Sequence, residues 1–132
     1  MAVINLQLDP GSGVATYLQL VHQVKHALRL GVLMPGDQLP TIKEVVADLA
    51  INPNTVAKAY RELEREGLVV GRPGLGTFVQ RSLGGGSTAD HTRLRRDLAR
   101  WLRDCREAGL DPDDMEALFT SMLSDSLREE TA

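Results

Sequence analysis

The sequence predicts a mostly α-helical protein with one small β-hairpin and a second, purely helical segment at its carboxyl end. Apolar residues recur with helical spacing in five stretches of the chain. A glycine-rich turn separates two short runs of strand-forming residues. Three consecutive glycines, at positions 84–86, then interrupt the pattern, because they cost too much backbone entropy to lie inside a helix or strand. These observations divide the chain into two parts.

Length and composition fit a small globular protein. The chain has 132 residues, of which 42% are hydrophobic and 25% charged. It contains no apolar run near the roughly 18 residues of a membrane span, and its amino terminus lacks the pattern of a signal peptide. Its single cysteine, Cys105, offers neither an internal disulfide nor a paired-thiol metal site. We therefore expect a cytoplasmic protein with no membrane partner, no metal and no cofactor.

Charge is distributed unevenly along the chain. The formal net charge is −3, but residues 1–83 carry eight Lys/Arg against seven Asp/Glu, and residues 84–132 carry seven against eleven. The acidic excess therefore lies in the carboxyl-terminal segment, and a basic face elsewhere can still bind phosphate. Composition alone neither supports nor excludes a nucleic-acid partner.

The first elements are an alternating segment and a long helix. Residues 4–8 alternate between apolar and polar side chains like a short strand, which Pro10-Gly11 ends. An amphipathic helix is expected from about Val14 to Leu30, stopped by Gly31, and residues 34–37 form a turn. Its apolar positions are Val14, Tyr17, Leu18, Val21, Val24 and Leu28.

Two shorter helices follow almost without a break. Thr41 and Glu44 have the spacing of a capping box, which starts the first of them. Asn52 is a good N-cap and Pro53 suits the first helical position, so a second helix begins at once and runs to Glu66. The first of these helices is expected to place Val45, Val46 and Leu49 inward.

A hairpin completes this part of the chain. Residues 68–70 and 77–79 read as two short strands around the turn at 71–76. Two short helices with a tight connection and then a β-hairpin form a winged helix-turn-helix. The predicted organisation is a winged helix-turn-helix domain over residues 1–81, a glycine-rich linker over 82–89 and a two-helix dimerisation hairpin over 90–132.

The second helix of the pair has the two faces that a DNA-recognition helix needs. Its inner face is apolar, whereas the outer row is basic or hydrogen-bonding, with Thr55 at one flank. We expect the amino-terminal residues to meet base edges in the major groove, and Arg61 to meet phosphate. The alternative is an ordinary solvated helix face. The inner residues are Val56, Ala59, Tyr60 and Leu63, and the outer ones Asn54, Lys58, Arg61 and Arg65.

The turn of the hairpin supplies further candidates. Arg72 can contact phosphate or the minor groove, although it can also be a plain turn arginine. Gly74 and Gly76 serve the backbone conformation of the turn. A nucleotide-binding loop is disfavoured, because the turn joins strand to strand and no Lys-Ser/Thr pair follows.

Residues 13–80 closely resemble the GntR family of bacterial regulators. The matching motifs are Tyr17-Leu18-Gln19, Leu33-Met34-Pro35-Gly36-Asp37-Gln38-Leu39-Pro40-Thr41, Asn52-Pro53-Asn54-Thr55-Val56, Ala59-Tyr60, Leu63-Glu64-Arg65-Glu66-Gly67-Leu68 and Gly74-Leu75-Gly76-Thr77-Phe78-Val79. The resemblance implies DNA contacts at Thr41, Lys43, Asn54, Thr55, Lys58 and the wing from Arg72 to Gly76.

The chain departs from the family at two of these places. At Lys43 the family usually has arginine; lysine keeps the charge but loses the bidentate geometry, so a phosphate contact is expected there. The family also often has a second basic residue near Ala57, which is absent here.

The short carboxyl-terminal segment resembles that of the YtrA-type subfamily. That resemblance implies dimerisation through the terminal helices, and control of the regulator's own operon and of a transporter. The residues agree, because a two-helix hairpin cannot bury two apolar stripes by itself and should pair with a second copy. The stripes consist of Leu94, Leu98, Trp101, Leu102 and Cys105, and of Met115, Leu118, Phe119, Met122 and Leu123.

Three other features have structural explanations. The methionine and phenylalanine side chains of the second stripe could line a ligand pocket, but helical spacing favours plain core. The arginine-rich run 93–106 is interleaved with acids, which favours a salt-bridged solvated face over a second DNA site. His22 and His26 have a metal-compatible spacing, but the sequence offers no evident third ligand.

The leading hypothesis is a homodimeric transcription regulator, a repressor that binds an inverted-repeat DNA operator. An unidentified small-molecule effector is a further partner that the sequence leaves open. An enzyme is disfavoured, because we recognise no catalytic constellation. A protein-interaction adaptor is the other alternative, although an adaptor would not need the basic outer row of the second helix.

Overall fold

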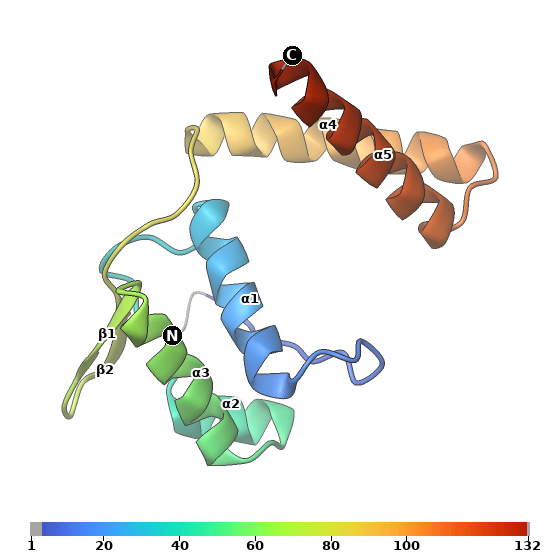
Figure 1. Ribbon diagram of the computed structural model, residues 1–132. Coiled ribbons are helices and arrows are strands. Elements are labelled where there is room, and N and C mark those ends of the chain that lie inside the picture. The colour runs from blue at the N-terminus through green and yellow to red at the C-terminus, as the bar shows by residue number, and fades with distance from the viewer. Residues whose placement is uncertain (1–3, 132) are drawn as a thin grey trace. The chain divides into compact units, whose positions relative to one another are not determined.

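The computed structural model describes residues 4–131, which form two compact units that divide between Thr88 and Ala89 (Figure 1). The first holds three helices and a two-stranded sheet, and the second holds two helices. A mostly helical fold with a small wing and terminal helices is therefore confirmed.

Helix α1 spans Thr16–Arg29 and is the central support of the first unit. It packs against α3 and buries Val21, Val24 and Leu28 of the predicted stripe, together with Leu20 and Ala27. Val14, predicted to belong to this stripe, precedes the helix and is exposed. The helix ends at glycine as expected: Gly31 has φ +73°, which lets the Val32 amide donate back to the Ala27 carbonyl over 2.9 Å.

Helices α2 (Ile42–Leu49) and α3 (Pro53–Arg65) form the helix-turn-helix. The Thr41 hydroxyl accepts from the Glu44 amide over 3.1 Å and the Glu44 carboxylate accepts from the Thr41 amide over 3.3 Å, so the predicted capping box is present. Asn52 caps α3 by accepting from the Asn54 amide over 2.8 Å. Between the helices, Ala50 adopts a left-handed conformation with φ +53°, which makes the connection tight.

Strands β1 (Val69–Arg72) and β2 (Gly76–Val79) pair antiparallel, with Val69 opposite Val79 and Arg72 opposite Gly76. We call residues 69–79 the wing. The segment before α2 lies along the outer edge of β2, where the Leu39 amide donates to the Thr77 carbonyl over 2.9 Å. Backbone hydrogen bonds from residues 36–39 therefore hold the wing along β2.

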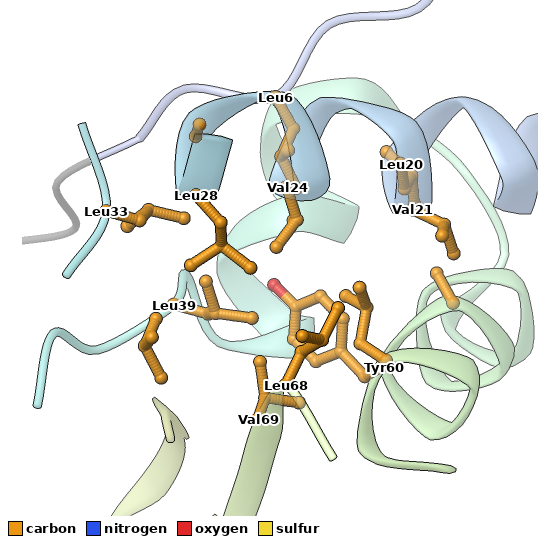
Figure 2. Packing of buried hydrophobic residues seen from close by; sticks show 14 of the residues in the cluster. Leu6, Leu20, Val21, Val24, Leu28, Leu33, Leu39, Tyr60, Leu68 and Val69 are labelled. Atoms are coloured by element: carbon orange, nitrogen blue, oxygen red, sulfur yellow. The ribbon is translucent and has the colours of Figure 1, made fainter. Parts of the chain in front are cut away.

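One apolar core joins these elements (Figure 2). Side chains from α1, α3 and β1 converge on it, together with Leu33 and Leu39 from the segment before α2. The members are Leu6, Leu20, Val21, Val24, Ala27, Leu28, Leu33, Leu39, Val45, Val56, Ala59, Tyr60, Leu63, Leu68, Val69 and Val79.

The predicted strand at residues 4–8 is wrong. Leu6 is buried, but residues 4–8 pair with no strand among residues 4–131. Its backbone bonds instead to side chains of α1: the Gln7 amide donates to Gln23 Oε1 and the Asp9 amide to Gln19 Oε1, each over 2.8 Å. Alternation therefore arises here from an extended segment lying along a helix.

The glycine-rich segment begins as part of the first unit. Leu83 is half-buried against the core, and a Cβ on Gly84 would lie 2.6 Å from the Arg29 carbonyl oxygen. Gly84 has φ +77°, so both its conformation and its closeness to α1 favour glycine. Helix α4 begins soon after, at Thr88.

The second unit consists of α4 (Thr88–Glu107) and α5 (Pro112–Thr131). Asp111 and Asp114 form a reciprocal cap at the start of α5, with bonds of 2.8 and 3.1 Å. Cys105 and Met115, which flank the turn, are its buried apolar residues among those described. Within the described range 4–131, no helix combines the length and apolar character of a membrane span.

Candidate nucleic-acid interface

Helix α3 presents the predicted outer row to solvent. Asn54, Lys58, Arg61 and Arg65 are exposed and Thr55 is half-exposed, whereas Val56, Ala59, Tyr60 and Leu63 are buried. Asn52 and Pro53 start the helix without consuming the side chain of Asn54 or Thr55. The end of α3 that carries these two side chains also has the positive end of the helix dipole, which favours an anionic partner.

Lys58 does not extend freely into solvent. Its ammonium nitrogen lies 4.1 Å from the centroid of the Tyr17 ring on α1. This cation–π contact limits the conformations of a side chain that is otherwise very flexible. Tyr17 therefore positions Lys58, a role that a reading of α3 alone could not find.

The two arginines of the row differ in their surroundings. Arg65 makes a bidentate pair with Glu62, through bonds of 2.5 and 3.0 Å. The hydrogen bond from Arg65 lowers the pKa of Glu62, so this carboxylate stays charged and offsets the guanidinium. Within the described part of the chain, no ion pair engages Arg61. Arg61 is thus the arginine of this row with charge available for phosphate.

Residues at the start of α2 lie beside the wing. Thr41 lines an open hollow together with residues 71–77. Its hydroxyl acts as an acceptor within the capping box, so the hydroxyl proton can still be donated to a phosphate oxygen. Lys43, in the first turn of the same helix, is exposed.

The wing has a braced tip. The Leu75 amide donates to the Arg72 carbonyl over 2.9 Å, with Pro73 and Gly74 between them. Proline followed by a glycine with φ +76° is the combination found in type II turns. Arg72 itself lies over the Phe78 ring, 5.1 Å from its centroid, and remains exposed.

Gln38 holds this tip from outside the wing. Its Nε2 donates to the Leu75 carbonyl over 3.0 Å. A Cβ on Gly76, which has φ +126°, would come within 2.5 Å of that same nitrogen. Gly76 therefore allows the close approach of Gln38 to the tip, because a side chain at this position would collide with it.

Tyr60 fixes α3 relative to the segment before α2. Its hydroxyl donates to the Pro40 carbonyl over 2.5 Å inside the core. Burial, assisted by the negative charge of Glu44, raises the pKa of Tyr60, so the phenol stays protonated and remains a donor. The amphipathic pattern placed this residue in the core but carried no information about its partner.

Most residues predicted to pair the two copies are exposed in the single chain. Trp101 and Leu102 are half-buried, and Met115 is buried beside the turn. The exposed members are Leu94, Leu98, Leu118, Phe119, Met122 and Leu123, and Leu127, which was not among the predicted residues, extends the same stripe of α5. Near the turn, α4 and α5 form the walls of an open apolar groove of about 350 Å³, lined chiefly by Leu98, Trp101, Met115 and Phe119.

The histidine pair of α1 and the arginine-rich run of α4 both lie on exposed faces of their helices. His22 and His26 are exposed on α1. The described residues include no group of three or more metal-ligating side chains. On α4, Arg93 lies 3.9 Å from Asp90 and 3.8 Å from Asp97, in the interleaved pattern expected of this charged face.

The profile of bacterial regulatory proteins of the gntR family matches residues 16–79, which span α1 to the end of the wing. The HTH-type transcriptional repressor YtrA of Bacillus subtilis is 31% identical over 121 residues, covering 91% of this chain and 93% of the repressor.

Two solved structures are similar in fold. YtrA from Sulfolobus acidocaldarius, a GntR-family transcription factor, has a TM-score of 0.54 at 31% identity, with 74% of this chain and 97% of that chain covered. The DNA-binding domain of AraR in complex with operator ORX1 has a TM-score of 0.50 at 28% identity, with 56% and 92% covered.

Proposed function

Since this chain belongs to the GntR family of DNA-binding transcription regulators, not to a family of enzymes, we propose that it binds an inverted-repeat operator as a homodimer and represses transcription there. The observation that carries the proposal is the outer row of α3, which combines an exposed Asn54 with an Arg61 that no ion pair engages within the described residues. The similar DNA-binding domain of AraR was crystallised in complex with an operator, which supports operator binding by this chain.

Within this proposal, α3 enters the major groove with its amino-terminal end toward the bases. Asn54 and Thr55 contact base edges, and asparagine can make two hydrogen bonds to adenine. Lys58, held by Tyr17, approaches a guanine edge from one fixed direction.

Phosphate contacts then surround the base contacts and set the register of the protein on DNA. Arg61 reaches one backbone, while Thr41, Lys43 and Arg72 reach another from α2 and the wing. Gly74 and Gly76 act here by shaping the tip. An adaptor without DNA would have no use for this arrangement of charges.

The second unit supplies the dimer contact. Exposed apolar side chains along both helices are too many for a stable isolated hairpin, so burial against a second copy is favourable. Charge also favours it: α4 carries six arginines against four acids, whereas α5 carries six acids against one arginine. Pairing of α4 with α5 of a second copy would bring opposite charges together.

A twofold dimer sets the operator geometry. Two recognition helices would meet half-sites about 10 base pairs apart, or a multiple of that, in inverted orientation. Occupation of a promoter at such a site is the mechanism of repression that we propose. DNA upstream of the chain's own gene, and upstream of a neighbouring transporter gene, is where we expect the operator.

The experiment is selection of binding sites from random DNA by the full chain, followed by fluorescence anisotropy on the selected DNA, the upstream DNA and a scrambled control. We expect an inverted repeat, bound about a thousandfold more tightly than scrambled DNA, with an affinity that falls steeply with salt. Enrichment of no sequence, with weak and equal binding to all three DNAs, would refute operator recognition and favour the adaptor.

A further inference from the structure

The tip of the wing exposes an unusual side chain. Leu75 is 65% exposed, more than any other large apolar residue in the described part of the chain. Scattered surface leucines need no explanation, but Leu75 lies in the turn beyond the last strand pair, Arg72 and Gly76.

Several contacts hold the backbone of Leu75 in that position. Its amide is bonded to Arg72 and its carbonyl to Gln38, and glycines with positive φ stand on both sides of it. Because the side chain is presented by a rigid turn, its burial against a ligand would cost little conformational entropy.

The surroundings of Leu75 indicate the ligand. The hollow beside it is lined by Thr41 and by the backbone and side chains of residues 71–77, including the positively charged Arg72. An apolar side chain next to a cation and a hydroxyl fits the minor groove of DNA, where sugars form apolar walls between two rows of phosphates. The hollow also continues the surface already assigned to DNA through Thr41.

Building on the proposed function, we propose that Leu75 enters the minor groove flanking each half-site and makes the protein prefer A·T base pairs there. The exocyclic amino group of guanine projects into the minor groove and A·T pairs have none. The branched side chain and this amino group would occupy the same space. Leu75 thus selects sequence at positions that α3 does not touch, without donating a hydrogen bond.

The test uses DNA selected by the wild-type chain, with flanking pairs changed to A·T, G·C or inosine·cytosine. An inosine·cytosine pair differs from a G·C pair only in lacking the guanine amino group in the minor groove. A comparison of these two flanks therefore isolates the effect of that group. We expect the wild type to bind A·T and inosine·cytosine flanks alike, and G·C flanks about tenfold more weakly. Leu75→Ala should reduce that difference to about twofold or less, while its salt slope stays unchanged because no charge is lost.

The matched control is Val32→Ala, which trims another exposed apolar side chain of the same unit, one that does not line the hollow. It should keep the wild-type flank preference. An equal flank preference in the wild type and Leu75→Ala would overturn the proposed role of Leu75, as would the absence of any preference in the wild type. Neither result would affect the operator proposal. Failure of the wild type to select any DNA would overturn the operator proposal as well.

Discussion

The two arginines on the outer face of α3 provide a test of whether position or mere charge determines DNA binding. Arg61→Ala and Arg65→Ala remove the same charge from the same helix, one turn apart. They differ in one respect: Arg65 is bonded to Glu62 through two hydrogen bonds, whereas Arg61 has no ion-pair partner in the described structure.

The expected magnitude follows from counterion release. Each phosphate contact contributes about 0.9 to the slope of log affinity against log salt, and a dimer loses two contacts per substitution, hence about 1.8. Between 50 and 200 mM salt, the wild type should therefore lose about tenfold more affinity than Arg61→Ala. Arg65→Ala should change the slope by less than half as much, because its charge is already offset by Glu62.

The assay is fluorescence anisotropy of each variant on the selected operator at four or more salt concentrations. Thermal unfolding of the same samples checks that both substitutions, which lie on the exposed face, leave the fold intact. Equal slopes for the two variants would refute the reasoning, because summed charge and not the pairing seen in the structure would then determine binding.

Three further substitutions test the contacts that support the DNA-binding surface and the proposed dimer. Tyr60→Phe leaves the Pro40 carbonyl without its buried donor and should lower the free energy of unfolding by about 1–3 kcal/mol in urea denaturation; an unchanged midpoint would contradict the importance of this bond. Gln38→Ala frees the wing tip and should lower operator affinity severalfold with little change in thermal midpoint, whereas full affinity would show that the brace is dispensable. Phe119→Glu places a charge in the exposed apolar stripe and should convert the dimer to monomer in sedimentation velocity; Thr120→Glu, on another face of α5, should not, and dimers in both would move the interface elsewhere.

Several features could be read directly from the chain because their causes are local. Thr41 and Glu44 lie one helical turn apart, so their reciprocal bonds form wherever that helix forms. Asn52 followed by Pro53 starts α3, and Gly31 stops α1, by preferences that belong to those residues themselves. Helical periodicity likewise determined which face of α3 is buried and which is exposed.

The sequence by itself thus determined the five helices, the hairpin and the outer row of α3, because backbone preference and amphipathic period act over only a few residues. Only the tertiary structure decided which residues distant in the sequence hold the side chains of the DNA-binding surface in place. Tyr17 lies under Lys58, Gln38 reaches the wing, and Tyr60 bonds to Pro40 across 20 to 41 positions of the chain. Such contacts depend on how helices pack, and the failure of the strand at residues 4–8 has the same cause: alternation specifies a buried face but not the neighbour that covers it.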